Sequence, residues 1–157
     1  MELRVGSGFD AHGRDEARPL VIGGVEIVGA AGLAGHSDAD VLSHAIADAL
    51  LGAAGLGDLG ARFPGDERWR EASSLDILRA VAGLLAEAGW RVVNVDATVV
   101  AEAPRLAPYR DEMAARVAAA LGLEAAAVSV KATTTDRLGF TGRGEGIAAF
   151  AVALLER

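Results

Sequence analysis

One segment limits the possible folds more than any other: residues 38–56 form a long, almost wholly apolar run of small side chains. The run has the length of a helix, and very few of its positions are polar. A helix that is apolar on every side must be buried almost all round. We therefore expect an enclosed helix here, with Ser37 as its cap and Asp40 at its third position completing a capping box.

The chain before this helix predicts strands. Residues 2–9 alternate between apolar and other side chains, and residues 19–28 indicate two short strands around the turn signal Gly23-Gly24. Small residues over 29–37 indicate a loop.

The chain after this helix predicts a long loop and then alternating helices and strands. A final segment rich in Ala and Leu suits either a strand or a helix, and the glycine-rich GRGEG before it favours a strand. The predicted elements are a loop over 57–72, a helix from Ser73 or Ser74 to Gly89, a strand over 90–100, a helix from Pro108 to near Gly122, and strands over 128–132 and 147–155.

This mixture predicts an α/β (α+β) fold, a mixed β-sheet with helices packed on one face. A length of 157 residues suits one domain and is too short for two of ordinary size, so we expect a single domain over residues 1–157. Hydrophobic residues make up 52% of the chain, and 20 glycines add to that fraction. One small core hides less apolar surface than this, which indicates self-association.

Charge and cysteine content exclude several classes of function. The formal net charge is −7 and Lys131 is the only lysine, so we expect no nucleic-acid partner and no binding to an anionic membrane. The absence of cysteine excludes disulfides, thiolate zinc sites and a cysteine nucleophile. No membrane-length apolar stretch or signal pattern is present, so we expect a cytoplasmic bacterial protein, or a plastid stromal one if a plant chain has been processed.

Two of the three histidines lie in positions suited to a metal. If the first strand continues through Asp10 and His12, both side chains point to one face, and His44 lies in the first turns of the apolar helix. One carboxylate and two imidazoles are ligands of the zinc type, and an open fourth position marks a catalytic site. The alternative is that both histidines are ordinary hydrogen-bonded polar residues, although a histidine buried in this helix needs a partner.

Polar neighbours of this group have two possible roles each. Asp48 lies one turn after His44, and it either fixes the His44 tautomer or acts as a solvated or helix-capping carboxylate. His36 and Ser37 precede the helix, where backbone N–H groups form an anion site or where Ser37 is simply a cap.

Two later motifs contain groups that suit phosphates and divalent ions. KATTTD at 131–136 places three hydroxyls and the Asp136 carboxylate after a strand. Hydroxyls can bond phosphate oxygens and a carboxylate suits Mg²⁺ or Mn²⁺, although threonines are also ordinary strand residues. FTGRGEG at 140–146 is a glycine-rich turn with an Arg and a Glu, and it is unspecific by itself.

Five motifs, taken in order, resemble one family. They are GFDAH at 8–12, HSDADV at 36–41, DALLGAAGLGDLG at 48–60, KATTTD at 131–136 and LGFTGRGEG at 138–146. Each motif is weak alone, but the ordered set covers essentially the whole chain and is similar to the 2-C-methyl-D-erythritol 2,4-cyclodiphosphate synthase family of the non-mevalonate route to isoprenoids.

The resemblance implies two kinds of metal ion and a defined assembly. Asp10, His12 and His44 match the ligands of one Zn²⁺ per subunit. Asp136 falls where the family carries a Glu that binds a second divalent ion, Mg²⁺ or Mn²⁺, on the substrate diphosphate. The family forms a homotrimer with its active sites between adjacent subunits.

The resemblance also implies which residues act on the small-molecule cytidyl diphosphate substrate. His36 and Thr134 match residues assigned to transition-state stabilisation. Residues 101–107 match part of a cytidine pocket, and residues 63–67 match a mobile loop. The implied substrate-binding set is Asp10, Ala11, His12, His36, Ser37, Asp58, Leu59, Gly60, Phe63, Pro64, Gly65, Asp66, Glu67, Ala101, Ala103, Pro104, Arg105, Leu106, Ala107, Thr133, Thr134, Thr135, Asp136, Phe140 and Arg143.

This chain departs from the family pattern at three positions. Gly65 stands in a loop that usually reads FPDTD, which alters the contacts of that loop. Ala39 replaces the glycine of HSDGD, a change that we expect a helix start to tolerate. Asp136 is one methylene shorter than the family's Glu, so we expect the second ion to lie closer to the backbone or to be held through water.

The implied reaction is a ring closure. The 2-phosphate of 4-diphosphocytidyl-2-C-methyl-D-erythritol 2-phosphate attacks the β-phosphorus, and CMP leaves. Because the attacking oxygen is already anionic, the enzyme must supply positioning and charge neutralisation rather than a strong base. Two other functions suit the same residues: a metal-dependent hydrolase that activates water, and a non-enzymatic trimeric binding protein with an apolar channel near Phe140 and Arg143.

Overall fold

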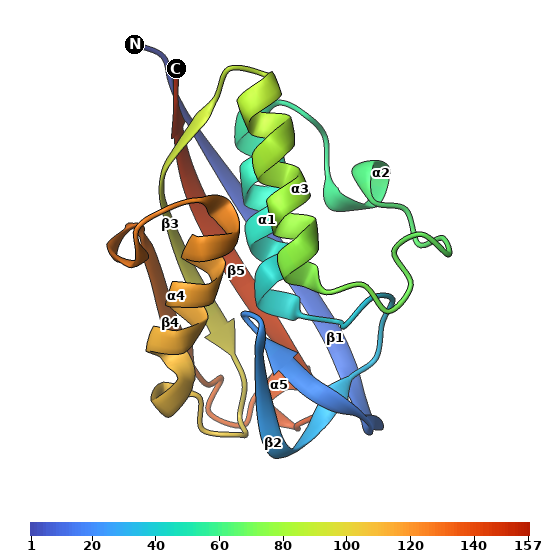
Figure 1. Cartoon of the computed structure of the whole chain (residues 1–157). Coiled ribbons are helices and arrows are strands. Elements are labelled where there is room, and N and C mark those ends of the chain that lie inside the picture. The colour runs from blue at the N-terminus through green and yellow to red at the C-terminus, as the bar shows by residue number, and fades with distance from the viewer.

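A five-stranded mixed sheet carries helices on one face (Figure 1). The computed structural model describes all residues from 1 to 157. The strand order is β2-β1-β5-β3-β4, in which β3 and β4 run parallel and the other pairs run antiparallel. The strands are β1 Leu3–Ile22, β2 Val25–Leu33, β3 Arg91–Val100, β4 Val128–Thr133 and β5 Gly146–Glu156.

Three long helices form the second layer (Figure 1). Helix α1 packs on β1 and β5, α4 packs on β4, and α3 lies against both α1 and α4. None of the helices is long and apolar enough to cross a membrane. The helices are α1 Val41–Ala54, α2 Leu59–Arg62, α3 Ser74–Glu87, α4 Arg110–Leu121 and α5 Gly139–Gly142, with short 3-10 turns at Ala107–Tyr109 and Ala125–Ala127.

The architecture confirms the predicted fold class and most of the predicted elements. The Gly23-Gly24 turn joins β1 to β2 with both glycines at positive φ, and Gly122 ends α4 in the left-handed conformation. The final segment is a strand that pairs with both β1 and β3. The first strand runs through Asp10 and His12, as the metal hypothesis requires.

Several predicted boundaries were wrong around the apolar helix. Asp40 rather than Ser37 is the N-cap of α1, since its side chain accepts a hydrogen bond from the Ser43 N–H. Ala39 lies before the helix at φ +55, a left-handed conformation that favours glycine, so the replacement of glycine there is strained rather than neutral. Residues 29–33 belong to β2 instead of a loop, and the predicted loop over 57–72 contains α2.

Glycines on β1 allow α1 to approach the sheet backbone to backbone. Gly6 and Gly8 are buried, and a Cβ atom on them would overlap the carbonyl oxygens of Ala49 and Ala45 respectively. Side chains alternate along a strand, so Asp10 and His12 continue the same row toward α1. The close approach at the glycines therefore also brings Asp10 and His12, in the middle of β1, against the helix that carries His44.

No helix of this chain covers the other face of the sheet (Figure 1), and the β1–β5 part of that face carries exposed apolar side chains. Val5, Phe9, Phe150 and Val152 are exposed there, and the Phe9 and Phe150 ring centroids lie 4.8 Å apart. We call these four residues the apolar sheet face. A contiguous exposed apolar surface marks an interaction site.

Replacing Gly8→Ala is expected to lower the free energy of unfolding by about 3 kcal/mol, because its methyl group has no room against the α1 backbone. Urea denaturation followed by circular dichroism measures this change. Gly83→Ala is the control: Gly83 lies in α3 with open space around it, so this variant is expected to gain about 0.5–1 kcal/mol. Equal effects of the two substitutions would contradict the backbone-to-backbone contact.

Candidate metal centre

Asp10, His12 and His44 meet at the end of α1 that faces the middle of β1; we call them the metal triad. The nearest carboxylate oxygen of Asp10 lies 2.8 Å from His12 Nε2 and 3.2 Å from His44 Nδ1. The two ring nitrogens lie 3.3 Å apart. Three ligand-type atoms from two elements distant in sequence thus converge on one point.

The donor set and its spacing fit a divalent metal ion. Two ligands of a tetrahedral zinc ion, each about 2.0–2.1 Å from the metal, lie about 3.3 Å apart. The spacings between His44 Nδ1 and each of the other two donors are close to that value. Only three protein ligands are present, so a fourth position is open to a substrate oxygen.

The electrostatics of the triad favour an ionised carboxylate between two imidazoles. Burial opposes ionisation of Asp10, but hydrogen bonds with His12 and His44 outweigh it and lower its pKa to about 2. Burial also opposes a charged His44, yet the contact with Asp10 raises the pKa of that histidine overall. Because metal ligands must be deprotonated, an ion at this site takes the place of the shared protons.

The second nitrogen of each histidine has a partner that orients the ring. His12 Nδ1 lies 2.9 Å from the carbonyl oxygen of Ala34, which can only accept a hydrogen bond. His12 therefore carries its proton on Nδ1 and turns Nε2 toward the triad. His44 Nε2 lies 2.9 Å from the hydroxyl of Ser74. This arrangement confirms that the buried histidine has polar partners.

Asp48 does not act on His44, so the first of its two proposed roles was wrong. Its carboxylate accepts a hydrogen bond of 2.7 Å from the Leu59 N–H, at the start of α2. Burial raises the Asp48 pKa and the Leu59 hydrogen bond opposes this effect. The capping alternative is the one that the structure supports.

The start of the apolar helix had two alternatives, an anion site or a cap by Ser37, and the structure shows a helix capped by Asp40 instead. The buried Asp40 carboxylate accepts hydrogen bonds from the N–H groups of Gly23, Gly24 and Ser43 and from the Ser43 hydroxyl. The Ser43 N–H is therefore already bonded within the protein.

A cavity of about 160 Å³ opens beside the triad; we call it the loop pocket. Its lining includes the two ligand histidines and part of the predicted loop. It also includes Trp69 and Ile77, which the sequence did not indicate as site residues. Trp69 packs edge-on against Phe63, with ring centroids 4.8 Å apart. The pocket is lined by His12, His36, Ser37, His44, Leu59, Gly60, Phe63, Gly65, Trp69 and Ile77.

A second cavity, of about 260 Å³, lies where β3 and β4 end; we call it the strand-end pocket. Ends of neighbouring parallel strands meet at one edge of a sheet, which is a common place for ligands. Its lining contains Glu102, whose Oε2 is buried without a hydrogen-bond partner. The full lining is Ala101, Glu102, Pro104, Arg105, Leu106, Ala107, Ala132, Thr133 and Thr134.

The structure does not bring all the predicted residues together in one chain. His36 lines the loop pocket and Thr134 lines the strand-end pocket. Four register partners lie side by side across neighbouring strands of the sheet, in the order Ala11, Ala148, Val100 and Thr133. Three strand spacings of about 4.8 Å place the two ends of that row about 14 Å apart.

The remaining predicted residues line neither pocket. Asp58 caps α2 by accepting a hydrogen bond from the Ala61 N–H. Asp136 lies at φ +52 with its carboxylate 3.3 Å from the Thr134 hydroxyl, and Arg143 forms an exposed ion pair with Glu145. Also exposed are Pro64, Asp66, Glu67 and Phe140, whereas Thr135 is half-buried.

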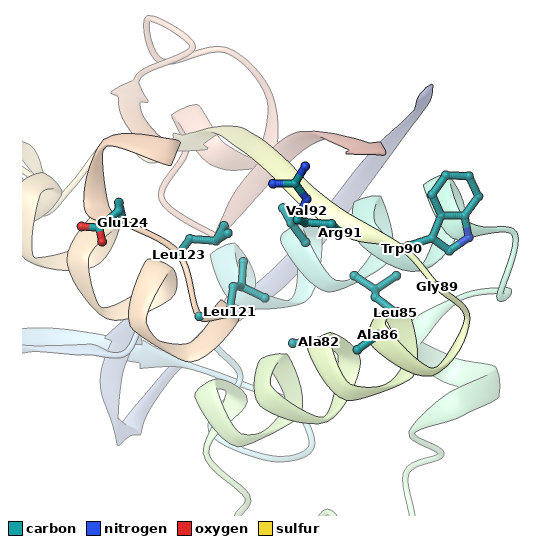
Figure 2. A pocket seen from close by; sticks show the side chains of 11 residues that line it. Ala82, Leu85, Ala86, Gly89, Trp90, Arg91, Val92, Leu121, Leu123 and Glu124 are labelled. Carbon is teal, nitrogen blue, oxygen red and sulfur yellow. The ribbon is translucent and has the colours of Figure 1, made fainter. Parts of the chain in front are cut away.

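The largest cavity of the protein lies elsewhere, and its lining contains no cluster of potential metal ligands. It measures about 670 Å³ and lies between the C-terminal ends of α3 and α4, where Leu85, Val92 and Leu121 point into it (Figure 2). Its charged side chains are Arg91 and Glu124. The metal triad and its neighbouring pocket are therefore the candidate functional site.

Comparison with known proteins agrees with this geometry. A family model described as the YgbB family matches residues 3–156. The chain belongs to the YgbB family. Curated relatives named 2-C-methyl-D-erythritol 2,4-cyclodiphosphate synthase include one from Syntrophomonas wolfei, 58% identical over 156 residues and 99% of both chains. Another, from Moorella thermoacetica, is 60% identical over 154 residues, 98% of this chain and 94% of the relative.

Solved structures of the same family match the fold. The bifunctional IspDF from Campylobacter jejuni superimposes with a TM-score of 0.94 and 41% identity, covering 98% of this chain and 42% of that one. A Plasmodium falciparum IspF in complex with CDP superimposes with a TM-score of 0.86 and 33% identity, covering 98% of this chain and 95% of that one. The match to the sheet and helices is thus nearly complete.

Removal of one triad histidine is expected to abolish metal binding. After dialysis against Zn²⁺ and then metal-free buffer, the wild-type chain is expected to retain about one ion and His12→Ala almost none, since only two ligands remain. His36→Ala is the matched control, because His36 lies outside the triad and its variant is expected to keep the ion. Mass spectrometry of the metal content gives the result. Retention by His12→Ala, or loss by His36→Ala, contradicts the site.

Proposed function

We propose that this chain converts 4-diphosphocytidyl-2-C-methyl-D-erythritol 2-phosphate to 2-C-methyl-D-erythritol 2,4-cyclodiphosphate with release of CMP, as one catalytic domain over residues 1–157. The observation that carries the proposal is the metal triad beside a cavity, in a chain 58–60% identical to synthases named for that product. The enzyme is a lyase that acts on a small molecule in isoprenoid precursor synthesis.

The geometry suits a reaction that needs no strong base. The attacking phosphate oxygen is an anion at neutral pH, so the protein must orient it and neutralise charge. Asp10, His12 and His44 hold the proposed Zn²⁺, which when bound polarises a phosphoryl oxygen at the open position. In each imidazole, the partner of the distal nitrogen keeps the ligand atom aimed at that position.

Two donors outside the triad act on the developing charge. The imidazole of His36 lies on the rim of the loop pocket, and the hydroxyl of Thr134 lies at the strand-end pocket. Preorganised donors of this kind stabilise charge that forms in the transition state. In this proposal Phe63 and Trp69 cover the loop pocket with apolar surface, which keeps water from competing with the attacking phosphate.

The strand-end pocket is the proposed nucleotide site. Two similar solved structures are CDP complexes. In this chain residues 101–107 except Ala103 line the cavity, together with Thr133 at the end of the neighbouring strand. Beside it, Asp136 offers one carboxylate to a Mg²⁺ or Mn²⁺ ion carried with the substrate diphosphate, a pairing typical of ions that keep phosphate oxygens and water as their other ligands.

We also propose that the chain forms a homotrimer in which the strand-end pocket of one subunit adjoins the metal triad of the next. Within one chain Ala11, which lies between the two β1 ligands, and Thr133 of the strand-end pocket are about 14 Å apart across the sheet. The apolar sheet face provides the surface through which copies pack. We propose a cytoplasmic location, on the basis of the bacterial relatives.

The direct test is ³¹P NMR of the protein with the cytidyl diphosphate substrate, Mg²⁺ and trace Zn²⁺. The expected result is CMP together with two coupled cyclic-diphosphate resonances. His44→Ala is expected to lower turnover by about 10³-fold or more while the trimer persists, because several kcal/mol of charge stabilisation are lost. CMP with a linear diphosphate identifies a hydrolase, and an unchanged spectrum from zinc-loaded protein identifies a binding protein; either overturns the proposal.

The assembly has its own test. Phe150→Glu is expected to convert the trimer to folded monomers, because a carboxylate on the apolar sheet face loses its hydration on packing. Val28→Glu is the control, since Val28 is an exposed apolar residue of β2 outside that face. Light scattering after size exclusion measures both masses. A Phe150→Glu variant that stays trimeric shows that another surface mediates assembly.

A further inference from the structure

The ring nitrogen of His44 that points away from the triad belongs to a buried series of hydrogen bonds that runs through Ser74 to Asp38. Nε2 lies 2.9 Å from the hydroxyl oxygen of Ser74, the first residue of α3. Ser74 is fully buried and His44 is nearly so. The hydroxyl of Ser37 also faces this nitrogen, at the longer distance of 3.3 Å. A buried contact of this kind holds the ring in one orientation.

Asp38, the last group in this series, determines which group donates and which accepts in each hydrogen bond. The Ser74 hydroxyl donates a hydrogen bond to Oδ1 of Asp38. The same carboxylate accepts the Ser74 N–H at 2.8 Å and the Asp40 N–H at 3.2 Å. An ionised carboxylate only accepts, and a serine hydroxyl has one proton to donate. Once that proton is directed to Asp38, the Ser74 oxygen can only accept from His44.

We propose that Ser74 and Asp38 are positioning residues that select the His44 tautomer with the proton on Nε2. Nδ1 is then left unprotonated and faces Asp10 and His12 as a metal ligand. The inference rests on the metal site of the proposed function, and it assigns to Ser74 the role that the sequence pattern had offered to Asp48. In His12 a backbone carbonyl accepts the proton of Nδ1 and leaves Nε2 unprotonated. Each imidazole of the triad therefore has its own acceptor for the nitrogen that does not bind the metal.

The local fold explains why Ser74, and not its neighbour, has this role. Asp38 lies in the segment between β2 and α1, and it binds the first residue of α3 through both oxygens. Ser73 is the N-cap by position, but its side chain makes no capping hydrogen bond and is exposed. Of two adjacent serines, only Ser74 is buried and reaches Asp38 and His44, which makes Ser73 the neighbouring control position.

The experiment compares Ser74→Ala with Ser73→Ala in the full-length chain. Zinc affinity is measured by competition with a chelating dye, and the protonated ring nitrogen of His44 is identified by long-range ¹H–¹⁵N correlation in the metal-free protein at alkaline pH. Ser74→Ala is expected to weaken zinc binding about 10- to 100-fold. Ser73→Ala is expected to stay within about twofold of wild type, as an exposed substitution should.

The tautomer of the metal-free wild-type protein decides the matter even if Ser74→Ala folds poorly, because a zinc ion on Nδ1 would itself leave the proton on Nε2. At alkaline pH, where His44 carries a single proton, metal-free wild type is expected to show that proton on Nε2, and a proton on Nδ1 overturns the inference. Equal zinc affinity of the two variants overturns it as well, while leaving the metal site and the cyclase intact. A wild-type chain that binds no zinc overturns the metal site itself. Failed cyclisation by a chain that binds zinc as expected overturns only the proposed function.

Discussion

The contact between the glycine face of β1 and helix α1 is the interaction on which the rest of the structure depends. Gly6 and Gly8 let the helix backbone lie directly on the strand, and the next two residues in that row are Asp10 and His12. A larger side chain at either glycine separates the helix from the sheet and moves His44 with it. The same packing therefore buries the core and assembles the metal triad.

One face of the sheet carries the metal triad, and the other carries the apolar surface proposed for assembly. Even-numbered residues at the start of β1 face α1, whereas Val5 and Phe9 face outward with Phe150 and Val152. Alternation along a strand makes this division possible within a few residues. The polar ligands are supported on all sides by acceptors that belong to loops and helix ends, such as Ala34 and Ser74. Support of this kind keeps a metal site rigid before the ion binds.

The sequence predicted what is periodic or locally encoded, and missed what the tertiary fold decides. The sheet, the three long helices, the Gly23-Gly24 turn and the triad follow from alternation, turn residues and motif order. The N-cap at Asp40 was missed because its partners include Gly23 and Gly24, which are distant in sequence. Trp69 and Ser74 were missed for the same reason: each acts through a contact with another element, and no spacing within the chain reports it.

The most direct test of the central claim is X-ray absorption at the zinc edge of the zinc-loaded protein. If α1 and β1 assemble a catalytic metal site, the spectrum shows two imidazole nitrogens at about 2.0–2.1 Å, with the multiple scattering typical of histidine, and oxygen ligands at about 2.0–2.2 Å. The His12→Ala protein then loses one imidazole contribution or the metal altogether. A zinc ion surrounded only by oxygen, or a spectrum unchanged by that substitution, contradicts the account.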